Sequence, residues 1–137
     1  RTWTLKELEP FQSVIDSGLA DSIMVAHVFN KRFDNMYPAS LSEKTINDFL
    51  RNKMNYKGVV ITDDLQMNAI SKHYKLRETI KLAINAGDDI LLFGNQLSPS
   101  KEVNIQKLVS IVKSLIKSGE VKQSSIDSAN KRIDKMK

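Results

Sequence analysis

The chain has 137 residues, of which 41% are hydrophobic and 27% are charged, a composition typical of a globular domain with its own core. It contains no cysteine, which excludes disulfides, thiolate metal sites and cysteine nucleophiles, and no run approaches the roughly 18 apolar residues of a membrane span. The formal charge of +5 comes entirely from residues 100–137, where nine basic and four acidic residues are spread around helical patterns. We therefore expect neither a membrane nor a nucleic acid as partner. The chain also lacks a signal-peptide pattern, which is compatible with the cytoplasmic location that we expect.

The first part of the chain predicts a helix, a strand and a long loop. Pro10 stands at an early helical position, and Gly18 ends the helix. Residues 22–28 have almost no polar side chain before His27, which indicates a buried strand. Residues 29–40 are irregular, and long loops of this kind tend to line pockets.

A second helix and a second strand follow this loop. Leu41 and Ser42 begin the helix, with Ser42 as its N-cap and Leu41 able to pack against Ile46. Residues 59–61 form a short β-branched run between Gly58 and a polar stretch. Such a run is typical of a parallel strand that is covered on both faces.

The remaining pattern predicts a third strand and three further helices. Residues 67–73 form a loop, and the helical spacing that starts at Leu76 ends at Gly87. Residues 90–93 are apolar and form the third strand. After Ser98-Pro99 the pattern is purely helical.

The helical tail is divided at Gly119. Residues 105–116 place their apolar side chains on one helical face, and the spacing of Ser124 and Asp127 signals the start of a last helix. Three buried strands separated by amphipathic helices imply parallel βαβ units with right-handed crossovers. The predicted fold class is therefore α/β.

Two acids, Asp63 and Asp64, follow the second predicted strand. Ligands of α/β folds bind at the carboxyl ends of parallel strands, so these carboxylates lie where chemistry usually occurs. The alternative is that one of them only caps the next helix. His27 also ends a strand, and it either faces the same pocket or is satisfied by local hydrogen bonds.

Five segments stand in order along residues 8–95: Ile23-Met24-Val25-Ala26-His27-Val28, Tyr37-Pro38-Ala39-Ser40-Leu41-Ser42, Leu50-Arg51, Tyr56-Lys57-Gly58-Val59-Val60-Ile61-Thr62-Asp63-Asp64-Leu65-Gln66-Met67 and Ala86-Gly87-Asp88-Asp89-Ile90-Leu91. Together they resemble the catalytic barrel of glycoside hydrolase family 3, and within that family they most resemble bacterial β-N-acetylglucosaminidases. The resemblance implies a partial (β/α)8 TIM barrel with about three parallel strands over residues 1–99. Residues 100–137 would then be C-terminal helices that pack on the barrel.

The resemblance also implies roles for individual residues. Asp63 matches the nucleophile of a retaining β-N-acetylhexosaminidase, which forms a covalent glycosyl-enzyme that water later hydrolyses. His27 and Met67 match positions near the bound sugar. Asp64 should point to the opposite side of the strand and is the better candidate for capping. The implied substrate is a glycan that contains N-acetylglucosamine, from peptidoglycan fragments in cell-wall recycling, and no metal or organic cofactor is required.

The general acid/base is missing from the sequence. In these relatives a His–Asp pair on a mobile loop does that work, in a region that precedes the segments matched here. A complete barrel also takes about 250 residues and eight strands. We therefore expect the chain to be the C-terminal, nucleophile-bearing part of the barrel, inactive alone and completed by the N-terminal part of the same barrel.

Other functions stay open at this point. Another activity of the family, such as that of a β-glucosidase, is disfavoured because those relatives more often carry an aromatic residue where Asp64 stands. A non-catalytic carbohydrate-binding or interaction module would need no nucleophile. A stand-alone α/β domain without a site would fold cooperatively as a soluble monomer.

Overall fold

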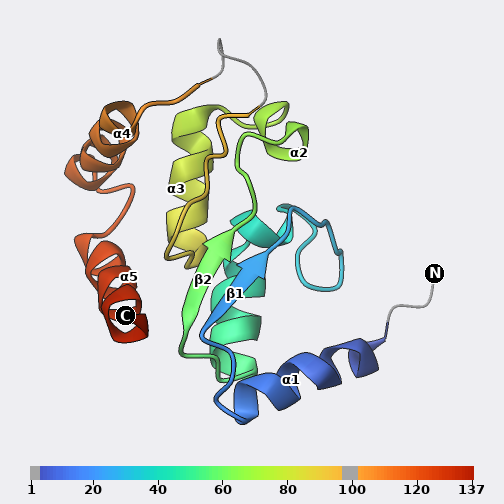
Figure 1. Cartoon of the computed structure of the whole chain (residues 1–137). Coiled ribbons are helices and arrows are strands. Elements are labelled where there is room, and N and C mark those ends of the chain that lie inside the picture. The colour runs from blue at the N-terminus through green and yellow to red at the C-terminus, as the bar shows by residue number, and fades with distance from the viewer. Residues whose placement is uncertain (1–3, 97–101) are drawn as a thin grey trace.

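A computed structural model describes residues 4–96 and 102–137 of the chain. Two parallel strands lie at its centre, α3 packs beside β2, and α4 and α5 lie on the α3 side of the sheet, away from α1 (Figure 1). The elements in chain order are η1 (Leu5–Leu8), α1 (Glu9–Asp16), β1 (Ser22–Val25), η2 (Ala39–Leu41), η3 (Lys44–Lys53), β2 (Val59–Thr62), α2 (Asn68–Ser71), α3 (Leu76–Ala86), α4 (Ile105–Lys117) and α5 (Gln123–Met136).

The sheet has the predicted parallel pairing. Its register runs from Ser22 opposite Val59 to Val25 opposite Thr62, and η3 lies in the crossover between the strands. A mixed α/β architecture with a parallel sheet is therefore confirmed. β1 is shorter than predicted, because it ends at Val25, two residues before His27.

The prediction of a third strand is wrong in form. Residues 90–93 run beside β2, but a single bridge between Ile61 and Ile90 is the extent of the ladder in the described part of the chain. The N–H of Leu92 donates to the hydroxyl of Thr62 at 3.0 Å, where a continued ladder would use a backbone carbonyl. A side chain thus takes the place of the next ladder partner, and the segment stays attached without becoming a regular strand.

The two faces of the sheet have different surroundings. Ile23, Val25 and Val60 point to one face, where they pack in a core with Ile46 and Tyr56. On the other face, Met24 is 57% exposed and Leu92 is 38% exposed. Parallel sheets are normally covered on both faces. This second face is therefore open to a further layer of protein.

A second core joins the C-terminal helices to α3. Its buried members are Ile80, Ile84, Leu115 and Val121. α3 ends at Gly87, as predicted, and the reason is steric as well as conformational. Gly87 has a φ of +107°, and a Cβ there would collide with the side chain of Asn47.

Several predicted boundaries differ from the structure. α5 already begins at Gln123, so Ser124 and Asp127 lie inside the helix and do not start it. Residues 67–73, predicted as a loop, contain α2. Local hydrogen bonds set these starts, as the one from Ser125 N–H to the carbonyl of Lys122 does in α5.

The helix predicted from Leu41 has a different start but the expected cap. Leu41 closes the 3₁₀ turn η2, and the π-helix η3 begins at Lys44. The Ser42 hydroxyl accepts the N–H of Thr45 at 3.1 Å, so Ser42 does cap the backbone. Ser98-Pro99, and with it the division expected between residues 99 and 100, lies outside the described residues. In the described ranges, none of the helices is long and apolar enough to cross a membrane.

Candidate functional site

Asp63 lies directly after β2, at its carboxyl end. Its N–H donates to the carbonyl of Val25 at 3.1 Å, which extends the parallel pairing by one bond. Its Oδ1 accepts the N–H of Asp64 at 2.8 Å. Within residues 4–96 and 102–137, Oδ2 has no hydrogen-bond partner. The half-buried carboxylate therefore has one fixed oxygen and one oxygen that is available to a ligand.

Asp64 uses its carboxylate to hold the surrounding backbone. Its Oδ1 accepts the N–H of Gln66 at 3.0 Å and the N–H of Gly94 at 3.1 Å. Met67, not Asp64, is the N-cap residue of α2. The capping role predicted for Asp64 is therefore wrong, because its carboxylate accepts N–H groups from its own turn and from the segment beside β2 instead of capping a helix. A Cβ at position 94 would lie 2.6 Å from Oδ2 of Asp64, so any larger residue there would force the Asp64 side chain to shift.

His27 is hydrogen-bonded through both ring nitrogens. Nδ1 lies 2.6 Å from the hydroxyl of Ser40, and Nε2 lies 2.8 Å from the backbone carbonyl of Asp64. A carbonyl oxygen can only accept, so Nε2 carries the proton and donates. The histidine therefore joins the end of β1 to the end of β2 and to η2. Its predicted contact with a sugar stays a prediction.

Met67 lies in the turn that follows Asp64. Its N–H donates to the Asp64 carbonyl at 3.0 Å, and its side chain is 41% exposed. The structure thus brings Asp63, His27 and Met67 into the same end of the sheet. The role of Met67 beside a bound sugar stays a prediction.

Asp34 organises the long loop before η2, and sequence reasoning missed it. It is buried, its Oδ1 accepts the N–H of Met36 at 2.8 Å, and its Oδ2 accepts the Ser42 hydroxyl at 2.8 Å. Burial pushes the pKa of Asp34 upward, but these hydrogen bonds, with those of Tyr37 and the charge of Lys44, outweigh it and lower the pKa. An Asp that precedes turn-forming residues is the signal that could have identified this role.

A further pair of hydrogen bonds joins the turn after β2 to the segment after residue 93. The amide of Gln66 donates to Oδ1 of Asn95 at 2.9 Å, and the N–H of Asn95 donates to Oε1 of Gln66 at 2.6 Å. Asn95 has a φ of +50°, a conformation that Asn tolerates better than most residues. The two residues are 29 positions apart, so no local pattern predicts their pairing.

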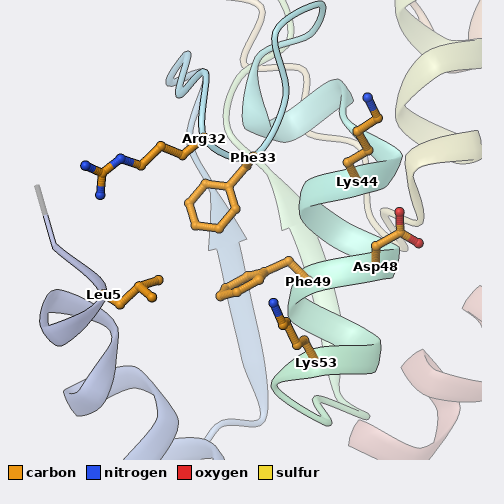
Figure 2. Close-up of a pocket in the computed structure, with 7 residues that line it drawn as sticks. All are labelled: Leu5, Arg32, Phe33, Lys44, Asp48, Phe49 and Lys53. Carbon is orange, nitrogen blue, oxygen red and sulfur yellow. The ribbon is translucent and has the colours of Figure 1, made fainter.

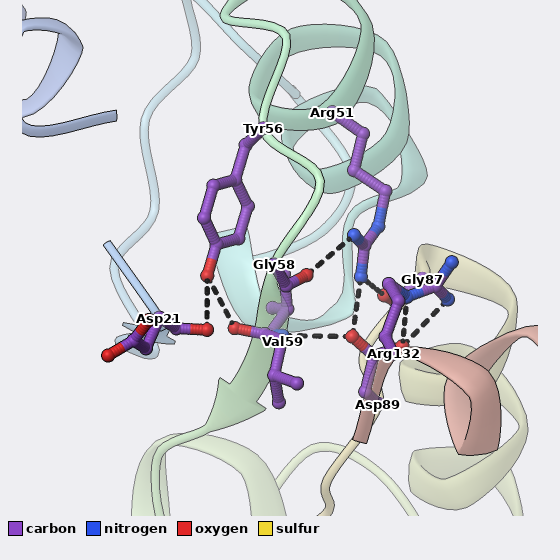
Figure 3. A network of polar contacts seen from close by, with 9 residues as sticks. Asp21, Arg51, Tyr56, Gly58, Val59, Gly87, Asp89 and Arg132 are labelled. Atoms are coloured by element: carbon purple, nitrogen blue, oxygen red, sulfur yellow. Dashed lines mark hydrogen bonds and ion pairs between the residues drawn. The ribbon is translucent and has the colours of Figure 1, made fainter. Parts of the chain in front are cut away.

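The opposite end of the sheet holds a separate ionic network. Figure 3 shows Asp89 between Arg51 and Arg132, which donate to its two carboxylate oxygens at 2.8 and 2.7 Å. Val60 N–H also donates to Asp89, and Arg51 reaches the backbone carbonyls of Gly58 and Gly87. Because this network lies at the amino end of β2, it belongs to the end of the strands associated with stability.

Tyr56 closes the same end of the sheet. Its hydroxyl donates to the carbonyl of Val59 at 2.9 Å and lies 3.2 Å from the carbonyl of Asp21 (Figure 3). Burial raises the pKa of Tyr56 to about 12, so the phenol stays protonated at neutral pH. Its role is therefore structural.

Two hollows lie away from Asp63. One, of about 510 Å³, is lined mainly by apolar side chains of α3, α4 and α5, together with Asp88 and Asp89. The other, of about 480 Å³, is lined by Leu5, Arg32, Phe33, Lys44, Asp48, Phe49 and Lys53. Figure 2 shows Phe33 and Phe49 facing each other, with ring centroids 4.6 Å apart. None of the predicted site residues lines either hollow. Over the described ranges, no group of three or more His, Cys, Asp or Glu side chains could hold a metal ion.

Comparison with known proteins gives one family. The family described as "Glycosyl hydrolase family 3 N terminal domain" matches residues 3–136. A β-hexosaminidase of Haemophilus influenzae (strain PittEE) is 40% identical over 90 residues, which cover 66% of this chain and 25% of the relative. The chain thus spans about a quarter of the length of this relative and of other curated relatives that it matches.

Solved structures of the same family have the same fold over this segment. The β-N-acetylglucosaminidase of Thermotoga maritima matches with a TM-score of 0.82 and 30% identity, over 93% of this chain and 27% of that protein. The family 3 β-N-acetylglucosaminidase of Paenibacillus sp. str. FPU-7 matches with a TM-score of 0.83 and 33% identity, over 95% of this chain and 24% of that protein.

Proposed function

This chain belongs to glycosyl hydrolase family 3, and we propose that it supplies the nucleophile, Asp63, of a retaining β-N-acetylhexosaminidase. The observation that carries the proposal is the state of the Asp63 carboxylate. It stands at the carboxyl end of a parallel strand, with Oδ1 held by the Asp64 N–H and Oδ2 unpartnered among the described residues. A carboxylate held in this way is oriented and open to a substrate.

The reaction is a double displacement. Oδ2 of Asp63 attacks the anomeric carbon while the bond from that carbon to the leaving oxygen breaks, and the leaving oxygen takes a proton from a general acid. Water then attacks the glycosyl-enzyme, gives a proton to the same group acting as base, and releases the carboxylate. The Asp64 N–H keeps the carboxylate oriented through both steps.

The general acid/base comes from outside this chain. Oδ1 of Asp64 accepts the N–H groups of Gln66 and Gly94, and both nitrogens of His27 are hydrogen-bonded. We assign the missing group to the N-terminal part of the same barrel, which would also cover the open face of the sheet. The partial length of the match and the exposure of Met24 and Leu92 on that face support this assignment.

The substrate proposed is a glycan with a terminal N-acetylglucosamine, from peptidoglycan fragments. Its support is the activity for which the relatives are named, as β-hexosaminidases and β-N-acetylglucosaminidases. Met67, exposed in the turn after Asp64, is the residue that we place at the rim of the sugar site. A polar contact from His27 to the sugar would require one of its two hydrogen bonds to break.

The proposal is tested with Asp63→Ala in the full-length enzyme that contains this chain. Turnover of an aryl N-acetylglucosaminide should fall by several orders of magnitude, on the scale of other lost nucleophiles. Binding of free N-acetylglucosamine should survive. Added azide should restore turnover, because it can attack from the side that the carboxylate has vacated.

The matched control is Asp48→Ala, which removes an exposed carboxylate of η3 that lines the separate hollow. Its turnover should equal that of the parent enzyme. Undiminished turnover in Asp63→Ala would refute the proposal and favour a non-catalytic carbohydrate-binding role.

A further inference from the structure

We propose that His27 and Asp64 are positioning residues that fix the orientation of the Asp63 carboxylate, and that the His27 nitrogens do not bind the sugar. The inference rests on the proposed role of Asp63 as nucleophile. It departs from the contact with sugar that the family resemblance implies for His27. Three steps in the hydrogen-bond pattern lead to it.

The first observation concerns how the Asp63 side chain is held. Within the described residues, the carboxylate accepts one bond, from the N–H of Asp64 at 2.8 Å. The direction in which Oδ2 points therefore depends on where that N–H lies. A shift in the position of Asp64 would therefore change the direction from which Oδ2 of Asp63 attacks the anomeric carbon.

The second step is the way in which Asp64 is held. Its carbonyl accepts Nε2–H of His27 at 2.8 Å and the N–H of Met67 at 3.0 Å. Its carboxylate accepts the N–H groups of Gln66 and Gly94. Two of these four bonds come from its own turn. The other two come from the chain after β1 and from the segment beside β2, so they are the ones of the four that tie Asp64 itself to the neighbouring segments.

The third step is the tautomer of His27. Ser40 is fully buried in η2, and its hydroxyl lies 2.6 Å from Nδ1. When the hydroxyl donates to Nδ1, the remaining ring proton lies on Nε2, where the Asp64 carbonyl needs it. A path of hydrogen bonds therefore runs from Ser40 through His27 and Asp64 to Asp63.

This path makes a direct role in sugar binding unnecessary. Each ring nitrogen of His27 already has a protein partner at a short distance, so neither is available to a sugar hydroxyl. The effect of losing His27 should fall on the chemical steps. A displacement of about 1 Å in a reacting group is enough to cost on the order of 100-fold in rate.

The test compares His27→Leu with His27→Gln in the full-length enzyme. Leu removes both hydrogen bonds, whereas the Gln amide can still donate to the Asp64 carbonyl. His27→Leu should lower kcat by about 100-fold, with KM and the affinity for free N-acetylglucosamine unchanged. His27→Gln should recover most of that loss. His73→Leu, which alters an exposed histidine after α2, is the matched control and should resemble the parent.

A second variant keeps the test decisive if His27→Leu does not fold. Gly94→Ala introduces a Cβ that would lie 2.6 Å from Oδ2 of Asp64 and displaces that carboxylate without touching His27. It should show the same fall in kcat at constant KM. The inference is overturned if KM and N-acetylglucosamine affinity weaken together in both His27 variants, or if kcat is unchanged in His27→Leu.

The two proposals fail in different ways. The full-length enzyme can be labelled with an N-acetylglucosaminyl donor that carries fluorine at C5 and an activated leaving group. If the glycosyl adduct maps to a residue other than Asp63, the proposed function is wrong and this inference fails with it. An adduct that maps to Asp63 at the parent rate in both His27→Leu and Gly94→Ala removes this inference alone.

Discussion

Asp88 is a carboxylic acid that the fold buries almost completely. It is 4% exposed, and neither carboxylate oxygen has a donor in the described part of the chain. Burial raises its pKa well above the usual range, the neighbouring Asp89 raises it further, and Arg51 only partly offsets these effects. Folding therefore binds a proton at this residue over a range of pH in which the unfolded chain would release it.

This residue predicts the sign of a pH dependence. Because the folded pKa is raised, the contribution of Asp88 to stability is complete below the unfolded pKa of about 3.9 and is lost as pH rises through the folded value. Asp88→Asn cannot ionise. The free energy of unfolding of the variant, relative to the parent, should therefore increase as pH rises from about 4 upward. Urea denaturation at a series of pH values measures this difference.

Stability is measured as a difference from the parent because Asp34, which both proteins contain, changes stability with pH in the opposite direction. Its pKa is lowered, so its contribution is lost as pH falls. Asp48→Asn, which replaces an exposed acid, is the control. Its difference from the parent in the free energy of unfolding should not change with pH. A flat difference in Asp88→Asn as well would show that Asp88 is ionised in the folded protein.

Sequence patterns predicted the place of Asp63 at the end of a strand but not the hydrogen bonds that hold it. A β-branched run followed by acids indicates a strand that ends at a site, and this information is local. The bonds from His27 to Asp64 and from Gly94 to Asp64 join residues 37 and 30 positions apart. Such contacts depend on the register of neighbouring segments, which no single pattern in the chain contains.

Among the elements, those with a strong local signal were the ones predicted well. α3 combines helical spacing with a glycine stop, and the parallel pairing of β1 with β2 follows from their apolar runs. The prediction of a third strand was wrong because the Thr62 hydroxyl, and not a backbone carbonyl, accepts the N–H of Leu92. An apolar run in the sequence does not reveal which of the two acceptors is used. The predicted start of α5 was wrong because Ser124, a residue type common at N-caps, lies inside the helix.

The network around Asp89 ties three elements together and should be needed for stability. Arg51 belongs to η3, Arg132 to α5, and Asp89 precedes the segment beside β2, with a side chain that is fully buried. Removing one partner from a buried charge typically costs about 3–5 kcal/mol. Arg51→Ala should approach that cost, because Arg51 also donates to two backbone carbonyls.

Arg132→Ala should cost less, about 1–3 kcal/mol, since Asp89 keeps Arg51 and the N–H of Val60. Arg77→Ala is the control, because its pair with Glu120 is exposed and should contribute little to stability. Chemical denaturation measures all three. Equal losses in Arg77→Ala and Arg51→Ala would contradict the structural role given to Asp89, whereas kcat of the folded variants should match the parent.

The molecule as a whole is an α/β layer with one covered and one open sheet face. Met24 and Leu92 are exposed on the open face, where Asp63 also lies by the alternation of side chains along β2. The segment matches about a quarter of the length of its curated relatives. We propose that the N-terminal part of the barrel completes the open face and brings the general acid/base to Oδ2 of Asp63, which has no hydrogen-bond partner among the described residues.

The most direct measurement is intact-mass and peptide analysis after incubation with an N-acetylglucosaminyl donor that carries fluorine at C5 and an activated leaving group. The fluorine slows both steps, and the good leaving group reduces the need for the general acid, so the glycosyl-enzyme accumulates. The account predicts one adduct on Asp63 in the full-length enzyme, and none in Asp63→Ala or in the 137-residue chain alone. An adduct on any other residue, or none in a full-length enzyme that turns over substrate, would contradict it.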